Sequence, residues 1–173
     1  QNHIFTLPVE VAGESVKSKI ERINGELKKL EADGIIIVTL DAVAWTFNMR
    51  GNDVEYNPVA VAYAYVSENE TVLFVDPDKI SEEIAEEYKE QGIIISDYNN
   101  VFEYVANLPA DSKVCVTGNK INWKLLQTIP ESCKIVDVPS PVDLMKSIKN
   151  ETELEGFRNA MIKDGVALVK FYM

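Results

Sequence analysis

The chain has 173 residues, enough for one domain and a further short element, because compact domains typically contain about 100–200 residues. Its 46% hydrophobic and 26% charged residues are typical of a globular protein. The 17 basic and 28 acidic residues give a net charge of −11, which repels nucleic-acid phosphates and anionic membrane surfaces. We therefore expect no nucleic acid and no membrane among its partners.

The sequence also predicts a soluble, cytoplasmic protein with reduced cysteines. It has no apolar run of about 18 residues, and residues 1–3 do not begin a signal peptide, although a leader could have been removed. Cys115 and Cys133 lie in separate short apolar segments, without the spacing of a metal site or a disulfide framework. We expect both to be reduced core residues.

The first third of the chain predicts a helix, a buried strand and a short helix. Apolar residues spaced by three and four predict a helix over residues 13–33, with Gly34 ending it in the left-handed conformation. Residues 35–40 are almost all apolar, which is typical of a central strand buried on both faces. A short helix over residues 42–47 follows, capped by Asp41, and its Trp45 and Phe47 are expected in the core.

A hairpin and then a regular alternation of strands and helices come next. Residues 67–70 are too few for a crossover, so strands 59–66 and 71–75 should pair in antiparallel fashion. This alternation predicts a three-layer α/β/α sandwich with a mixed sheet of about six strands, and Tyr63 and Trp123 are expected in its core or at the core boundary. The later elements are predicted as helix 77–91, strand 92–96, a helix from Asn100 to Leu108 with a capping box at Glu103, strand 114–117, helix 121–129 and strand 133–138.

The alternation ends at two prolines, Pro139 and Pro141, which cannot continue a strand ladder. A short helical piece over residues 143–149 is expected there. A long helix then starts at Asn150, because Glu153 three residues later completes a second capping box. Its apolar stripe should require a partner, and it comprises Leu154, Phe157, Met161, Leu168 and Phe171.

Few residues suggest catalysis. A dinuclear metal site needs several carboxylates and usually a histidine, but the one histidine, His3, lies in a segment expected to be loose. Without a positioned histidine, no serine or cysteine has an obvious base, and no phosphate-binding glycine motif is present. The acidic run over residues 82–87 opposes an apolar stripe and is expected to be a solvated helix face.

The candidate site follows the central strand, where open α/β sheets collect ligands. Arg50 can hold a carboxylate, with Asp53 as its partner and with Tyr56 and Asn57 offering hydrogen bonds. A structural interpretation is that Arg50 and Asp53 pair across their own turn while Asn57 leads into the next strand. A third interpretation is that these residues contact and support a neighbouring domain.

Three segments resemble one family. LDAVAWTFNMRGNDVEYNP at residues 40–58, SPVDLMKSIKNETELEGFRNA at residues 140–160 and DGVALVKF at residues 164–171 are similar to three-domain Xaa-Pro aminopeptidases. The resemblance runs from residue 8 to residue 171 and implies a creatinase/prolidase N-terminal-like fold with ribonuclease H-like topology. It also implies a parent that removes the N-terminal residue from peptides with proline in second position, using two manganese ions in a pita-bread catalytic domain. No catalytic residue or metal ligand of the family can be assigned to this chain.

The resemblance further implies a division of the chain. Residues 1–13 would be an interdomain linker, 14–139 the second creatinase N-terminal-like domain, 140–149 a linker, and 150–173 the first helix of the catalytic domain. The expected partners are the parent's own N-terminal and catalytic domains, proline-containing peptides through the parent, and a second copy of the chain through the exposed C-terminal helix. The alternative is a non-enzymatic peptide- or protein-binding module of a peptidase-like protein that has lost its metals.

Overall fold

The computed structural model describes residues 3–173, so Gln1 and Asn2, with which the predicted linker begins, lie outside the described residues. In chain order the elements are β1 (Phe5–Thr6), α1 (Val9–Ala12), α2 (Val16–Lys29), β2 (Gly34–Ile37), α3 (Leu40–Thr46), β3 (Met49–Arg50), β4 (Ala62–Ser67), β5 (Thr71–Val75), the 3-10 helix η1 (Pro77–Lys79), α4 (Glu82–Glu90), β6 (Ile93–Ser96), α5 (Asn100–Ala106), β7 (Lys113–Val116), α6 (Trp123–Thr128), β8 (Lys134–Asp137), α7 (Pro141–Ser147) and α8 (Glu151–Tyr172).

The main sheet has six strands in the order β6-β5-β4-β2-β7-β8. β4 runs antiparallel to both β2 and β5, whereas the other neighbouring pairs are parallel, so the sheet is mixed as predicted. β2 lies near its centre with all four residues buried, which explains its apolar sequence.

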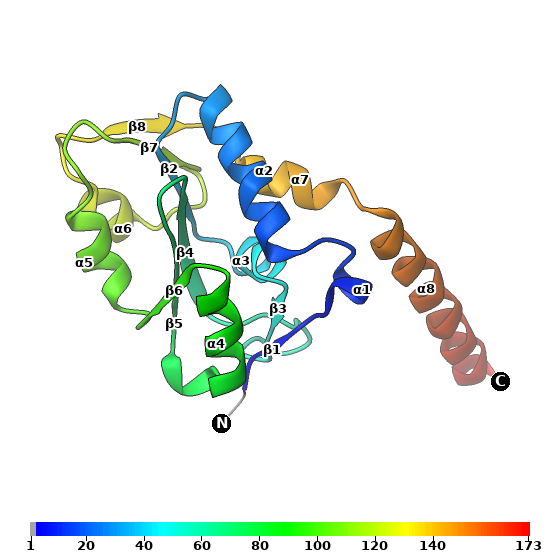
Figure 1. Cartoon of the computed structure of the whole chain (residues 1–173). Helices are drawn as coiled ribbons and strands as arrows, with labels where there is room; N and C mark the ends of the chain where they lie inside the picture. Colours follow the sequence, from blue (N-terminus) through cyan, green and yellow to red (C-terminus); the bar gives the residue numbers. More distant parts are fainter. Residues whose placement is uncertain (1–2) are drawn as a thin grey trace.

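The sheet separates two hydrophobic cores. The larger lies between the sheet and α2, α3, α4 and α7, where Ile23, Val43 and Tyr88 are fully buried. The smaller lies against α5 and α6, around Val105 and Leu125. Figure 1 shows α5 and α6 on one side of the strands and α2 and α4 on the other. The three-layer α/β/α sandwich is therefore confirmed.

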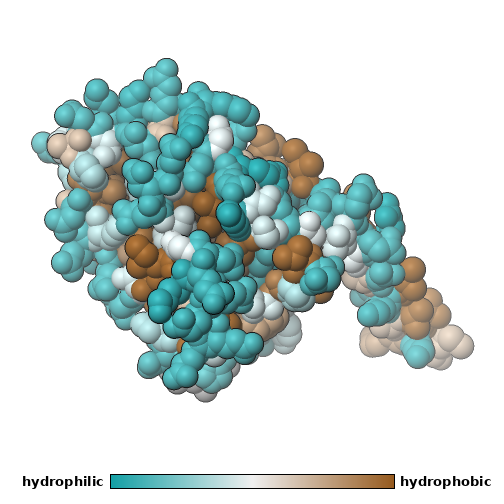
Figure 2. Space-filling view, viewed as in Figure 1, coloured by the Kyte–Doolittle hydropathy of each residue, from teal (hydrophilic) through white to brown (hydrophobic). Residues whose placement is uncertain are grey.

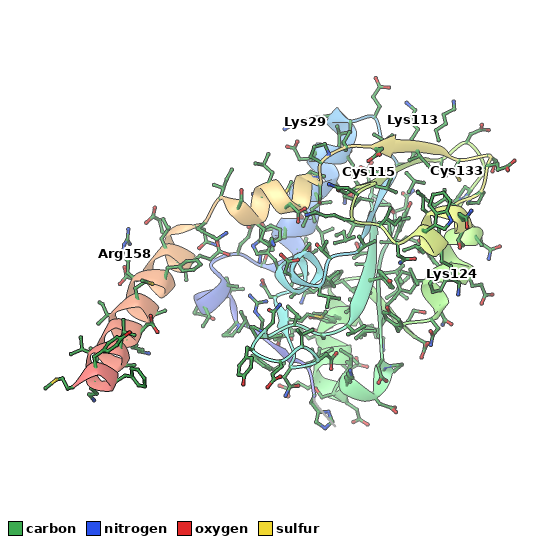
Figure 3. All side chains as sticks on the ribbon, turned by 180° about the vertical axis from the view of Figure 1, so that it is seen from behind. Lys29, Lys113, Cys115, Lys124, Cys133 and Arg158 are labelled. Carbon is green, nitrogen blue, oxygen red and sulfur yellow. The ribbon has the colours of Figure 1, made fainter. Side chains whose placement is uncertain are left out.

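Most predictions about the core side chains are confirmed. Trp45 and Phe47 are buried in the larger core, and both cysteines are free. Figure 3 places Cys115 on β7 and Cys133 in the turn before β8, where Cys133 is half-buried. Trp123 was predicted at the core or its boundary, and this is wrong because 70% of its surface is exposed at the first turn of α6.

Helix α2 ends earlier than predicted, and a different residue takes the left-handed conformation. The helix stops at Lys29, and Glu31, with φ of 51°, makes the left-handed turn. Gly34 is instead the first residue of β2, where a Cβ would overlap the hydroxyl of Tyr65 on β4. Glycine is needed there for close approach of a neighbouring side chain.

Two predicted caps are also wrong. Thr39 precedes α3, and Asp41 lies in its first turn, where its carboxylate pairs with Lys146 of α7. Asn100 does not cap α5, because Asn99 precedes the helix and the Asn100 amide donates to Ser96. In both cases the side chain has a partner outside its own helix.

The predicted helix over residues 77–91 is divided, and the later short helix is shifted. Pro77–Lys79 forms η1, after which Ser81 starts α4 by accepting a hydrogen bond from the Ile84 N–H. Helix α7 begins at Pro141 rather than at residue 143, because Ser140 caps it and proline is favourable in a first turn.

The N-terminal segment is packed rather than loose over its described part. Ile4 is buried in the larger core, and β1 pairs with β3 in antiparallel register. Ile4 N–H also donates to the carbonyl of Lys79. Residues 3–13 therefore pack as part of this domain, and their role as a link to another domain stays a prediction.

Helix α8 begins as predicted and projects away from the sheet. Asn150 and Glu153 form the capping box, and none of the residues of α8 is buried. Figure 1 shows the helix extending beyond the body of the domain, and Figure 2 shows apolar atoms along it. Within residues 3–173, none of the helices combines the length and hydrophobicity that crossing a bilayer requires.

Lys19 of α2 is a buried charge without a carboxylate in hydrogen-bond contact. Only 1% of its surface is exposed, and its ammonium group donates to the Trp45 carbonyl at 2.9 Å and to the Asn48 side chain at 2.6 Å. The group also lies 4.3 Å from the centre of the Trp45 ring, a favourable cation–π position. Burial lowers the pKa of Lys19 to about 8, although Glu14 and Glu153 favour the charged form.

This lowered pKa predicts that stability rises with pH. The unfolded chain binds a proton at Lys19 up to pH 10.5, whereas the folded chain releases it from about pH 8, so alkaline pH favours folding. Relative to Lys19→Met, the unfolding free energy of the natural chain should rise by about 2 kcal/mol between about pH 7 and 9.5. Denaturant melts of both proteins across this range measure the difference, with Lys17→Met on the exposed face as control. A constant difference between the natural chain and Lys19→Met would contradict the prediction.

Candidate functional site

A cavity of about 520 Å³ opens where α1, α3, the segment after β3 and the start of α8 meet. Arg50 lines it from the end of β3, Asn57 from the segment that follows, and Trp45 from α3. Glu153 and Phe157 of α8 form the facing wall. The cavity thus combines an aromatic ring, an apolar side chain, a cation and a carboxylate.

Arg50 reaches this cavity because β3 follows α3 through a tight turn at Asn48. Asn48 has φ of 49°, a left-handed conformation that asparagine tolerates better than most residues. The Arg50 guanidinium donates from Nη1 to the carbonyls of Ala44 at 3.0 Å and Met49 at 2.8 Å. Burial lowers the pKa of Arg50 from its usual value while Glu153 opposes that change, and an arginine remains charged at neutral pH.

Asp53 has a different partner from the one predicted. Its Oδ1 lies 2.7 Å from Nζ of Lys79, and its Oδ2 accepts the backbone N–H of Val61 at 2.8 Å. Burial opposes ionisation of Asp53, but these contacts outweigh it, and the pKa of Asp53 lies below its usual value. The predicted pairing of Arg50 with Asp53 across their own turn is therefore wrong.

The backbone explains why the turn separates the two residues. The N–H of Gly51 donates to the Pro58 carbonyl and that of Asp53 to the Val59 carbonyl, so the segment folds back on itself. A Cβ at Gly51 would lie 2.9 Å from that of Ala60, which is closer than side chains approach. This pairing directs the Asp53 carboxylate towards η1 and leaves Arg50 on the cavity side.

The four predicted site residues therefore do not form one cluster. Arg50 and Asn57 both line the cavity, whereas Asp53 and Tyr56 are absent from its lining. Tyr56 is 97% exposed with φ of 60°, at the tip of a loop closed by a bridge between Val54 and Asn57. Whether these residues contact a substrate or a neighbouring domain stays a prediction.

Most of the lining residues, including charged ones, were not predicted as site residues. Glu153 was predicted only as a capping residue, and Asp41 only as a cap for its own helix. Lys146 of α7 also lines the cavity and pairs with Asp41, a contact between residues 105 positions apart that no local pattern reveals.

The cavity is suited to recognition by charge and shape. Residues 3–173 contain no group of three or more histidine, cysteine, aspartate or glutamate side chains that could hold a metal ion. His3 is exposed at the start of the described chain. A half-buried arginine beside aromatic and apolar walls can instead bind a carboxylate next to an apolar side chain.

The ion pair of Asp53 yields a stability prediction. The side chains of Lys79 and Asp53 are only 19% and 10% exposed, so Asp53→Ala leaves a largely buried ammonium group and the Val61 N–H without partners. The loss should be about 2–4 kcal/mol, compared with less than about 0.5 kcal/mol for the exposed control Glu55→Ala. Because folding lowers the pKa of Asp53, its contribution is present above pH 3.8 and is lost as pH falls through the lowered pKa. Denaturant melts at neutral pH test this, and equal midpoints for both variants would contradict it.

Comparison of the sequence and fold with known proteins identifies the family of the chain. A probable Xaa-Pro aminopeptidase P from Botryotinia fuckeliana is 38% identical over 176 residues, which cover 98% of this chain and 27% of that protein. The crystal structure of X-prolyl aminopeptidase from Caenorhabditis elegans, described as a cytosolic enzyme with a di-nuclear active site, superimposes with a TM-score of 0.90. It is 28% identical over 99% of this chain and 29% of that chain. The chain therefore spans less than a third of these relatives.

A more distant match agrees on the fold alone. An Xaa-Pro dipeptidase from Bacillus anthracis covers 82% of this chain with a TM-score of 0.55 at 13% identity. Residues 1–153, up to the third residue of α8, match the Creatinase/Prolidase N-terminal domain family. The chain therefore belongs to the creatinase/prolidase N-terminal domain family, in the form found in Xaa-Pro aminopeptidases.

Proposed function

We propose that this chain is a non-catalytic domain of an Xaa-Pro aminopeptidase, a hydrolase that removes the N-terminal residue from peptides with proline in second position. In this proposal the domain supports a catalytic domain that begins with α8, and its own N-terminal segment adjoins a further domain. The similarity to Xaa-Pro aminopeptidases over 98% and 99% of the chain supports the assignment. A cytoplasmic location is proposed because the Caenorhabditis elegans relative is described as cytosolic.

The observation that carries the supporting role is the uncovered apolar surface of α8. Phe157 is 55% exposed, Met161 67% and Leu168 54%, although side chains of this kind are normally covered in a folded protein. A contiguous apolar stripe on a projecting helix is typical of an interaction surface. The catalytic domain is the proposed partner, and residues 150–173 would then be that domain's first helix.

The cavity beside α8 has a role in the same proposal. Arg50 and Asn57 face the first turns of this helix, so groups that pack against α8 also approach them. We assign Arg50 to bind a carboxylate of the catalytic domain or of a peptide bound at its edge. Asp53 contributes indirectly, because its ion pair with Lys79 fixes the loop that carries Asn57.

The proposed hydrolysis takes place outside this chain. The resemblance implies two manganese ions in the catalytic domain, where they would supply a metal-bound hydroxide. The described residues offer no donor group that fits such a centre, so we assign none of them a part in the chemical step.

Activity measurements test the proposal. With manganese and an Xaa-Pro peptide, the parent protein should show turnover, whereas the 173-residue chain should show none and should bind no manganese tightly. The parent serves as the positive control for the metal and the substrate. Manganese-dependent turnover by the chain alone would refute its non-catalytic role, and an inactive parent would favour the non-enzymatic binding module.

Self-association of the isolated chain is a separate prediction. If the stripe of α8 is uncovered, two copies should associate through it, because each large apolar side chain contributes about 1.5–3 kcal/mol on burial. Replacing Phe157 and Met161 by serine should raise the dissociation constant of the self-associated chain at least about tenfold, whereas Lys163→Ser on the same helix should have little effect. Sedimentation velocity over a concentration series measures this. A natural chain that remains monomeric throughout would contradict the prediction.

A further inference from the structure

Asn150 joins two helices that are far apart in the sequence. Its side-chain oxygen accepts the N–H of Glu153 at 2.9 Å and so caps the start of α8. Its side-chain amide donates at 2.9 Å to the carbonyl of Ala12, the last residue of α1. One side chain therefore starts α8 and also satisfies a free carbonyl at the end of α1.

Gly13 makes this contact sterically feasible. It ends α1 with φ of 73°, a left-handed conformation that glycine adopts without cost. A Cβ at Gly13 would overlap the side-chain atoms of Asn150. Glycine is thus required here both by the backbone conformation and by the close approach of Asn150.

The N-terminal segment connects this contact to Arg50. In the β1–β3 ladder Phe5 lies opposite Arg50, and the N–H of Leu7 donates to the carbonyl of Asn48. Helix α1 follows directly, and Gly13 caps its C-terminus. Residues 5–13 therefore run from the strand that carries Arg50 to the first turn of α8.

Little else in the described chain holds α8. Helix α1 is the element against which α8 packs most extensively, and α8 itself has no buried residue. Figure 3 shows Arg158, in the second turn of α8, already beyond the edge of the domain. Val11 of α1 and Phe157 of α8 both line the cavity at Arg50, so the direction of α8 also sets the width of that cavity.

We infer that Asn150 is a positioning residue that fixes the direction of α8 relative to Arg50 through its hydrogen bond to Ala12. The N-terminal segment and α8 are thereby coupled: a displacement of residues 5–13 changes the direction of α8, and a displacement of α8 changes the position of α1. This coupling does not depend on which protein or domain covers α8.

Distances between two spin labels test the inference in this chain. Labels at Lys17→Cys on α2 and Lys163→Cys on α8 lie at exposed positions, with Cys133→Ser introduced to avoid a third label and the buried Cys115 left unchanged. Asn150→Asp keeps an oxygen that caps α8 but removes the N–H that donates to Ala12. Asn122→Asp is the matched control, because Asn122 also caps a helix and donates its amide to another residue, Tyr63, but lies on α6.

The labelled chain is diluted with an excess of unlabelled chain, so that distances between associated copies do not contribute. The expected result is one narrow distance distribution for the doubly labelled chain and for its Asn122→Asp variant, and a distribution at least twofold broader or displaced for its Asn150→Asp variant. Circular dichroism should show equal helical content, because the cap of α8 is retained. If Asn150→Asp does lose helical content, Gly13→Ala decides, since it leaves the cap residues of α8 unchanged and displaces Asn150 by overlap. The inference is overturned if the distance distribution is unchanged in Asn150→Asp with its helical content retained, or in Gly13→Ala where that content is lost.

Discussion

The burial of one ammonium group, that of Lys19, constrains the arrangement of α2, α3 and the strand that follows. A buried cation without an ion pair needs acceptors, and the chain provides the carbonyl of Trp45 and the side chain of Asn48. Asn48 has its backbone in the left-handed region, at the turn between α3 and β3. Its amide then donates to the carbonyl of Glu14, which precedes the N-cap residue of α2. The hydrogen bonds around this one charged group therefore join α2, α3, the turn at Asn48 and the residue Glu14 before α2.

The candidate site depends on this network. The turn at Asn48 starts β3, and β3 places Arg50 beside α3, where the guanidinium donates back to the carbonyl of Ala44. The same turn supplies the carbonyl that accepts from Leu7, which aligns β1 and leads to α1. Both walls of the cavity thus depend on the network around Lys19. One wall carries Arg50 on β3, and the other is α8, which contacts α1.

Sequence patterns predicted the architecture better than they predicted partners. The hairpin of β4 and β5, the buried β2 and the capping box at Asn150 depend on residues within a few positions of one another, and all three are present. The predicted pair of Arg50 and Asp53 also relied on short spacing, but the backbone folds between them and Asp53 reaches Lys79 instead. Short spacing therefore predicts a contact only where the backbone between the residues is regular.

The sequence by itself determined the fold class, the family and the start of α8, because alternation, helical periodicity and capping are set by local geometry. Only the tertiary structure decided that Lys19 is buried, that Asp41 pairs with Lys146 and that Asn150 donates to Ala12. These contacts join residues 26 to 138 positions apart, and a polar side chain carries no local sign of which distant group it will reach. The folded sheet and its helices bring those groups together, and at the buried Lys19 the energetic cost of leaving polar atoms without partners then selects the pairs that form.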